Sequence, residues 1–166
     1  MKNNFYTAIG LMSGTSMDGV DASLIISDGI NEYSNIIDEF YEFDDKLHQK
    51  LINLRNLIYN KDDLLKYSKD LNKLERDLTI FHSKIVNEII KKYKGEIDLI
   101  GFHGQTIFHN PKIGISRQIG NGILLSQLTK KKVVYDFRQE DVDNGGQGAP
   151  LTPIFHNLLS TKLNIK

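Results

Sequence analysis

Three runs of apolar residues with a strand-like pattern open the chain. Residues 5–11 and 22–26 flank a segment rich in glycine and hydroxyl side chains, which predicts two strands joined as a β-hairpin. Residues 32–43 alternate loosely between apolar and polar side chains and follow the turn Asp28-Gly29, so we expect a third strand there. The pattern therefore predicts a sheet that starts with antiparallel strands.

Two amphipathic segments follow these strands. Acidic residues at 44–45 precede the first, whose apolar side chains recur at helical spacing on one face: Leu47, Leu51, Leu54 and Ile58. The second covers residues 62–93 and is expected to form one helix, roughly 45 Å long, that ends at Lys94-Gly95. Its spacing also satisfies a coiled-coil heptad, but strands predicted on both sides favour packing against a sheet. We expect His82 at the surface or boundary of this helix.

Shorter elements complete the predicted fold. Residues 97–102 form an apolar run directly after a helix, which is typical of a buried parallel strand. Residues 115–119 and 133–135 predict two further strands, with a helix over residues 122–129 between them and a short helix from Pro153. This order predicts an α/β domain with a mixed sheet, antiparallel at its start and parallel later, and with flanking helices.

Composition narrows the class of protein. A chain of 166 residues is expected to form a single domain, residues 1–166, with a substantial core. The 21 basic and 21 acidic residues balance, so charge gives no indication of nucleic acid or of an anionic membrane as partner. No cysteine is present, which excludes disulfides and thiolate metal sites. No segment resembles a signal peptide or a membrane span, so we expect a cytoplasmic protein.

The turn between the first two strands is the first candidate site. Ser13-Gly14-Thr15-Ser16 places four small or hydroxyl residues in a row, so backbone N–H groups and hydroxyls could approach an anion closely. The carboxylate of Asp18, and that of Asp21 further on, would repel a bare phosphate, which suggests a bound cation such as Mg²⁺. The alternative is a simple glycine hairpin, because the segment fits neither the P-loop nor the dinucleotide pattern.

Polar side chains also follow two later strands. His103, Gln105 and Thr106 come directly after the apolar run 97–102, and they offer the directional hydrogen bonds that a sugar requires. Arg138 follows the strand 133–135 and could bind a carboxylate with two hydrogen bonds. The alternatives are a polar strand end with a satisfied histidine, and an arginine that pairs with a neighbouring aspartate, Asp136 or Asp141, to fix its own loop.

Three motifs resemble those of the anhydro-N-acetylmuramic acid kinases, bacterial enzymes of peptidoglycan recycling. They are Gly-Leu-Met-Ser-Gly-Thr-Ser-Met-Asp-Gly-Val-Asp at 10–21, His-Gly-Gln-Thr at 103–106, and Asp-Phe-Arg at 136–138 followed by Gly-Gly-Gln-Gly-Ala-Pro-Leu at 145–151. The resemblance covers nearly the whole chain but only the first part of such an enzyme. It implies an actin-like, ribonuclease-H-like ATPase domain, the first of a two-domain sugar kinase whose second domain is absent. Lys130 departs from the pattern, since relatives often carry glycine there.

The resemblance also implies an activity and its residues. It implies ATP-dependent hydrolysis and phosphorylation of 1,6-anhydro-N-acetylmuramic acid to N-acetylmuramic acid 6-phosphate, with Mg²⁺. The implied cofactor-binding residues are Gly14, Thr15, Ser16, Met17, Asp18, Gly19, Val20 and Asp21, with Asp18 also a ligand of the metal. The implied substrate-binding residues are His103, Gln105, Thr106 and Arg138. The general base of the family lies in a later motif, so no catalytic residue is assigned here.

Two interpretations of the whole chain remain open at this point. In the first, the chain is the N-terminal part of such a kinase, inactive by itself, with the missing C-terminal half or a second copy as partner. In the second, it is a non-catalytic or degenerate remnant that retains only phosphate or sugar binding. Neither interpretation involves nucleic acid or a membrane.

Overall fold

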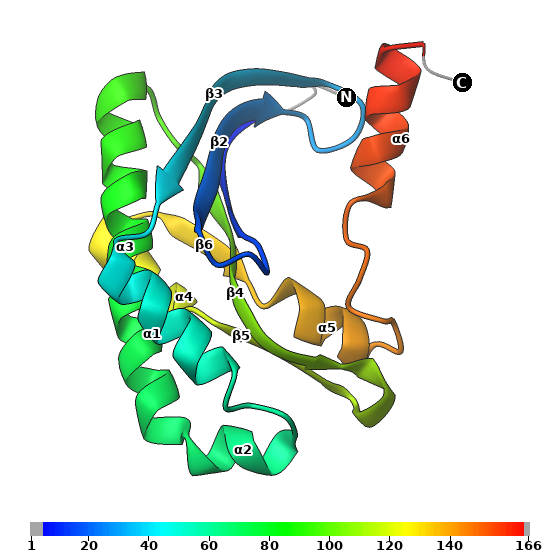
Figure 1. The fold of residues 1–166 in the computed structure, drawn as a ribbon. Coiled ribbons are helices and arrows are strands. Elements are labelled where there is room, and N and C mark those ends of the chain that lie inside the picture. The colour runs from blue at the N-terminus through cyan, green and yellow to red at the C-terminus, as the bar shows by residue number, and fades with distance from the viewer. Residues whose placement is uncertain (1–4, 165–166) are drawn as a thin grey trace.

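The computed structural model describes residues 5–164, and a mixed sheet of six strands lies at the centre of this part of the chain (Figure 1). The strand order is β3-β2-β1-β4-β5, with β6 paired to β4. The pairs β1–β2, β2–β3 and β4–β5 are antiparallel, whereas β1–β4 and β4–β6 are parallel, which confirms the predicted mixed sheet. The strands are β1 (Tyr6–Ser13), β2 (Gly19–Ser27), β3 (Tyr33–Glu42), β4 (Leu99–Asn110), β5 (Ile115–Ile119) and β6 (Lys132–Tyr135).

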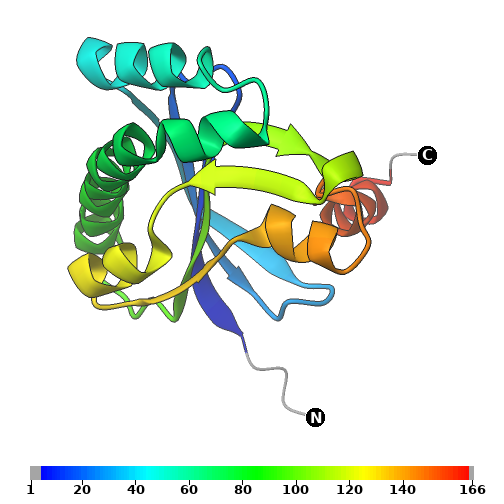
Figure 2. The same ribbon diagram turned by 90° about the horizontal axis from the view of Figure 1, so that it is seen from below.

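Helices α3 and α4 lie on one side of the sheet, and α5 and α6 lie on the other (Figure 2). The core is between the sheet and α3, whose buried apolar side chains recur at threes and fours. No helix in the described range 5–164 is long and apolar enough to cross a membrane. The helices are α1 (Asp45–Arg55), α2 (Lys61–Lys66), α3 (Ser68–Tyr93), α4 (Gly122–Thr129), α5 (Phe137–Asp143) and α6 (Pro153–Lys162), with a short 3₁₀ helix η1 (Pro111–Ile113).

The single helix predicted for residues 62–93 is wrong, because the segment forms α2 and α3 with a break at Tyr67. Tyr67 has φ −100° and ψ 18°, outside the helical region, and Figure 1 shows α2 turning away from the axis of α3. A capping box between Asn60 and Asp63 starts α2 as a separate helix. The apolar face of α3 packs on β2, β5 and α4, so the sheet takes the place of a coiled-coil partner.

His82 is fully buried, so its predicted surface or boundary position is wrong. Its Nδ1 lies 2.9 Å from the carbonyl oxygen of Leu78, and its ring centroid lies 4.9 Å from that of Phe102 in an edge-on contact. Burial lowers the pKa of His82 to about 4. The neutral imidazole therefore acts as a core residue that joins α3 to β4.

Strand β4 is longer than predicted and carries a bulge that the site depends on. Its partners on β1 are Leu11 for Phe102 but Ser13 for Gln105, so β4 contains one extra residue in this interval. Gly104 absorbs the irregularity with φ +70°, and a Cβ there would lie 2.5 Å from the carbonyl oxygen of Ile119. Because side chains alternate along a strand, the extra residue turns Gln105 to the same face as Phe102.

Candidate functional site

A buried residue of the loop between β1 and β2 anchors this loop to the core. Met17 adopts φ +60° and buries its side chain in the core, while its N–H donates to the carbonyl oxygen of Gly14 at 3.2 Å. Thr15 and Ser16 lie at the exposed tip. No hydrogen bond among residues 5–164 uses the backbone N–H groups of Thr15 and Ser16. The anchored turn therefore exposes two residues whose backbone donors are unused, while the Ser16 hydroxyl bonds to Asp18.

Gln105 of β4 braces this loop. Its Nε2 donates to the carbonyl oxygen of Gly14 at 2.9 Å, and its Oε1 accepts from Ser13 Oγ at 2.5 Å. Ser13 Oγ also lies 3.1 Å from the carbonyl oxygen of Gly19, at the other end of the loop. Since Gln105 is fully buried, it shapes the loop from inside rather than from the surface. No pattern in the sequence predicted this role, because Gln105 lies 91 positions from Gly14 and 92 positions from Ser13 along the chain.

Asp18 presents an exposed carboxylate at the same loop. Ser16 Oγ donates to Asp18 Oδ1 at 2.6 Å, and this bond is the main cause that lowers the pKa of Asp18. The group is therefore ionised at neutral pH. No cluster of three or more His, Cys, Asp or Glu side chains within the described range could hold a metal ion. Asp18 alone would supply one ligand to a cation, so bound phosphate or water would have to supply the others.

The residues predicted to bind a cofactor differ in what they expose. Met17 and Val20 have buried side chains, so only their backbone could reach a ligand. Gly19 is also buried, and a Cβ there would lie 2.4 Å from the carbonyl oxygen of Tyr41. Asp21 is exposed on β2, beside Met12 of β1. The accessible surface of the loop comes from Gly14, Thr15, Ser16 and Asp18.

A second cluster forms where β4 meets α5. Arg138 Nε donates to His103 Nε2 at 2.7 Å, and Arg138 Nη1 donates to the carbonyl oxygen of Gly148 at 2.5 Å. His103 Nδ1 lies 2.7 Å from the carbonyl oxygen of Gly104, which can only accept, so Nδ1 carries the proton and the ring is neutral. Burial, followed by the charge of Arg138, lowers the pKa of His103. Arg138 forms an ion pair with neither Asp136 nor Asp141 within the described residues.

Asp141 fixes the glycine-rich turn that follows α5. Its Oδ2 accepts the N–H of Gly148 at 2.7 Å, and its backbone carbonyl accepts the N–H of Gly146 at 2.8 Å. Gly148 has φ +67°, and a Cβ there would lie 3.1 Å from the carbonyl oxygen of Arg138. The turn therefore holds one edge of the guanidinium. The sequence did not predict α5, which brings Arg138 and Asp141 to this turn.

Comparison with known proteins decides the family. The family described as anhydro-N-acetylmuramic acid kinase matches residues 6–166. The chain belongs to this kinase family. It is 57% identical over 162 residues to the anhydro-N-acetylmuramic acid kinase of Pelagibacter ubique, covering 98% of this chain and 43% of the relative. The kinases of Brucella canis (41% over 163 residues) and Agrobacterium fabrum (40% over 163 residues) match 94% and 95% of this chain, and again 43% of the relatives. The chain thus spans less than half the length of these relatives.

Three of the predicted substrate residues, His103, Gln105 and Thr106, lie on β4, and the fourth, Arg138, lies on α5 beside His103, but not all are free. Thr106 Oγ1 accepts a hydrogen bond from Gln118 Nε2 at 3.3 Å, and Gln105 is used by the loop. His103 and Arg138 remain half-buried, with the outer guanidinium nitrogen, Nη2, making no hydrogen bond among residues 5–164. A direct contact of Gln105 or Thr106 with substrate stays a prediction.

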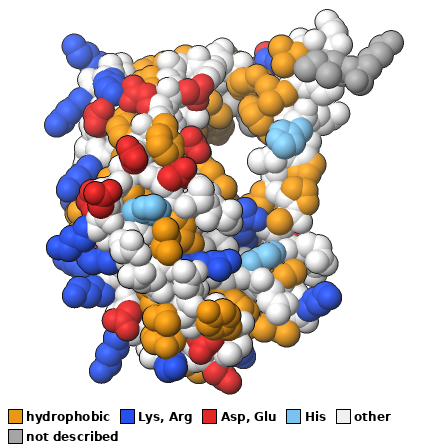
Figure 3. All heavy atoms as spheres, in the orientation of Figure 1, with side chains coloured by type: hydrophobic (Ala, Val, Ile, Leu, Met, Phe, Trp, Pro, Cys, Tyr) orange, Lys and Arg blue, Asp and Glu red, His pale blue; other side chains and the backbone are white. Residues whose placement is uncertain are grey.

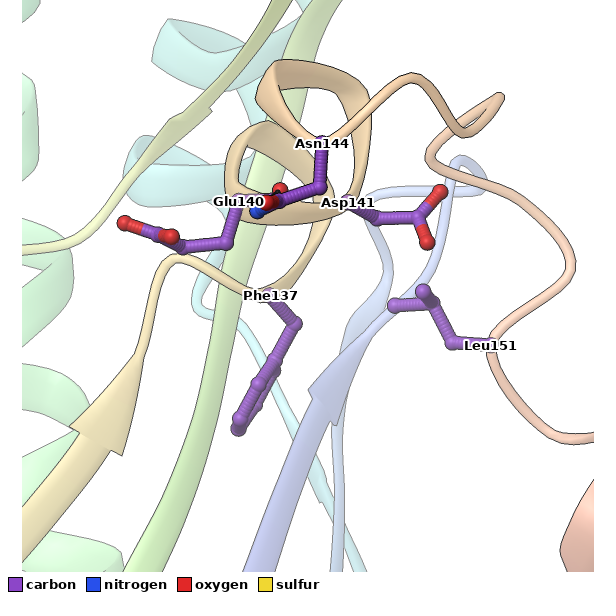
Figure 4. A pocket seen from close by; sticks show the side chains of 5 residues that line it. All are labelled: Phe137, Glu140, Asp141, Asn144 and Leu151. Carbon is purple, nitrogen blue, oxygen red and sulfur yellow. Dashed lines mark hydrogen bonds between the residues drawn. The ribbon is translucent and has the colours of Figure 1, made fainter.

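A hollow of about 610 Å³ opens beside this cluster (Figure 4). Phe137, Glu140 and Asp141 project from α5, and Leu151 approaches from the extended segment before α6; Asn144 completes the lining. Apolar side chains of Phe137 and Leu151 and the carboxylates of Glu140 and Asp141 line this hollow.

Proposed function

We propose that this chain supplies the phosphate loop and part of the sugar-binding wall of an ATP-dependent kinase. In the proposed reaction, water adds to C1 of 1,6-anhydro-N-acetylmuramic acid and the bond between C1 and O6 breaks. O6 takes the γ-phosphoryl group of ATP, which gives N-acetylmuramic acid 6-phosphate and ADP. The family match over residues 6–166 supports the kinase assignment. The braced loop at Ser13–Gly19 supports the proposed position of the phosphate site.

The loop suits a phosphate because its geometry is fixed before the ligand arrives. Transfer of a phosphoryl group depends mainly on positioning and on neutralising charge, and fixed backbone donors cost little reorganisation. Gln105 and Ser13 anchor the loop through hydrogen bonds and Met17 anchors it through its buried side chain, and the N–H groups of Thr15 and Ser16 are not used by other described residues. A Cβ at Gly14 would lie 3.6 Å from Ser16 Oγ, so a larger side chain there would stand beside the tip at which we place the phosphate.

Asp18 is the residue of this chain that fits a magnesium ion bound with ATP. Its carboxylate is ionised and exposed, and carboxylate oxygen is a preferred ligand of Mg²⁺. When bound, the metal would neutralise charge on the nucleotide phosphates. The Ser16 hydroxyl orients the Asp18 carboxylate through its hydrogen bond, so this chain holds the ligand in place for the metal.

The cluster at Arg138 suits the acidic part of the sugar. Muramic acid carries a lactyl carboxylate, and an arginine reads a carboxylate with directional hydrogen bonds. His103 and Gly148 fix one edge of the guanidinium, which leaves Nη2 to meet such a group. His103 acts here as a positioning residue, because both its nitrogens are already bonded.

A chimera tests the proposal. Residues 1–166 are joined to the part of the Pelagibacter ubique relative that lies beyond the match, and ADP release is measured with 1,6-anhydro-N-acetylmuramic acid. We expect ADP release that depends on this sugar and that is absent with ring-opened N-acetylmuramic acid. A chimera that melts cooperatively yet shows no release dependent on the anhydro sugar would overturn the proposal.

The remnant interpretation receives no support from the comparisons, since all three relatives described above carry the name of the kinase. A cytoplasmic location stays a prediction.

A further inference from the structure

One face of the sheet is open at its centre. In strands β1 and β4, side chains alternate so that Ile9, Leu11 and Phe102 point toward α3. Their neighbours Gly10 and Gly101 pair with each other and face the opposite side, where they form a floor without side chains. A Cβ at Gly10 would meet no atom within 4 Å, and one at Gly101 would meet none closer than 3.8 Å. The floor is therefore exposed at Gly10, whereas Gly101 is half-buried, with the ring of Phe137 3.9 Å from its Cβ position.

Exposed apolar side chains surround this glycine floor. Val134 of β6 pairs with Gly101, while on β1 Met12 lies two positions after Gly10 and Tyr6 lies four positions before it. Phe40 of β3 is aligned with Met12 through Asp21 of β2. Each of these side chains is more than 40% exposed: Tyr6, Met12, Phe40 and Val134. Exposed apolar side chains that gather on one sheet face mark a surface at which another segment or protein binds.

Helix α6 stands beside this face without covering it. It buries none of its side chains and touches the rest of the fold at the turn between β2 and β3. There, Phe155 meets Tyr33 with ring centroids 5.2 Å apart, and Lys162 pairs with Glu32 at 3.1 Å. Ile154 is 85% exposed. Figure 3 shows an open space between α6 and the body of the molecule.

We propose that a helix from the part of the kinase chain that the relatives carry beyond this match packs onto the glycine floor of Gly10 and Gly101. The inference rests on the proposed function, because that function assigns the chain to a longer kinase. Glycine in a strand interior marks a close approach of another backbone, and a helix with an apolar stripe would contact Met12, Tyr6 and Val134 at once. The relatives contain such additional chain, since the match covers 43% of their length.

Single cysteines test the inference, because the chain has none of its own. Met12→Cys and Val134→Cys report on the floor, and Asn87→Cys, exposed on α3, is the matched control. Maleimide labelling is measured in the 166-residue chain and in the chimera. We expect labelling at 12 and 134 to be about 10-fold or more slower in the chimera, as in an interface that excludes water, and unchanged at 87.

A variant with a larger side chain on the glycine floor gives a second test of the inference. Gly10→Leu meets no atom of this chain at its Cβ, so the melting temperature of the 166-residue chain should stay the same. In the chimera it should restore most of the labelling at position 134. The aligned cysteines in the full-length Pelagibacter relative give a second measurement that does not depend on the chimera.

Three outcomes would overturn the inference. Equal labelling at 12 and 134 in the chain, the chimera and the relative would mean that nothing from the longer kinase covers the floor. Slow labelling in the chain that increases on dilution would indicate a second copy instead. Slow labelling independent of concentration would indicate that α6 closes over the floor. Sugar-dependent ADP release is measured separately, so loss of activity with intact protection would contradict only the proposed function.

Discussion

Single residues decide whether the loop at Ser13–Gly19 can serve a phosphate. Gln105 and Ser13 fix its backbone, and Gly14 leaves the space above it free. Met17 has the left-handed conformation that non-glycine residues seldom adopt, and burial of its side chain compensates for the cost.

Gly14→Val in the chimera should reduce kcat/KM at least ~10-fold, or about 1.4 kcal/mol of transition-state stabilisation. A Cβ at Gly14 meets only Ser16 Oγ, at 3.6 Å, so the fold should tolerate the substitution while the side chain obstructs the phosphate. The kinetics and the melting temperature are measured together. Unchanged kinetics would remove the loop from the site.

Arg138→Ala should weaken the muramyl substrate far more than an anhydro sugar that lacks the lactyl group. The reason is that the remaining edge of the guanidinium is expected to read the lactyl carboxylate. KM is compared for the two sugars in the chimera. Arg117→Ala is the control, because Arg117 pairs with Glu75 of α3 at 3.0 Å. Equal losses on both sugars would indicate that Arg138 only stabilises its loop.

His82 should make stability depend on pH. The unfolded chain takes up a proton on this residue near pH 6.5, but the folded chain does so only near its pKa of about 4. Stability is therefore complete above pH 6.5 and falls by up to ~3 kcal/mol as the pH drops to 4. Urea unfolding of His82→Leu should show a weaker pH dependence, whereas His48→Leu, at a half-buried position, should retain it. Identical slopes for wild type and His82→Leu would contradict this account.

At the scale of elements, the bulge in β4 organises both clusters. It turns Gln105 toward the loop while His103, two residues earlier, meets Arg138 of α5. An unbroken strand would place these two side chains on one face, because they are separated by two residues. The extra residue therefore lets one strand contact the loop at Ser13–Gly19 and the arginine cluster on opposite faces.

Gly104→Ala should lower the free energy of unfolding by at least ~1 kcal/mol more than Gly114→Ala. Both glycines have φ near +70°, so both substitutions carry the same backbone strain. A Cβ at Gly104 would lie 2.5 Å from the carbonyl oxygen of Ile119, whereas one at Gly114 meets no atom within 4 Å. Chemical denaturation of the two variants measures the difference. Equal losses would show that the bulge can relax.

At the scale of the whole molecule, the site is open on one side. The loop at Ser13–Gly19, the arginine cluster and the hollow beside α5 come from one sheet and its flanking helices, and the glycine floor is exposed at Gly10 on the face where α6 stands apart. A transfer reaction requires a closed cleft that orients both substrates and excludes water.

The 166-residue chain by itself should therefore not turn over the anhydro sugar. ADP release from the purified chain is compared with that from the chimera at equal concentration. Sugar-dependent release from the chain alone would contradict this expectation and would mean that one of its own carboxylates activates the water.

The sequence by itself determined the order and kind of most elements, because periodicity is a local property of the chain. The mixed sheet and the first and last helices follow from it, and so do the three motifs that mark the family. It predicted His103, Gln105 and Thr106 just beyond a strand, whereas the structure places them inside β4.

Only the tertiary structure decided the roles of the candidate residues, since they depend on contacts between distant residues. Gln105 reaches Ser13 across 92 positions because of one extra residue in β4, and no pattern in the sequence signals a bulge. Likewise, His82 is buried because α3 packs on the sheet. Arg138 of α5 donates to His103 rather than pairing with an aspartate. The helical spacing of apolar residues also continues through Tyr67, although the backbone leaves the helical conformation there. A capping box at Asn60 starts α2, and α3 begins after Tyr67.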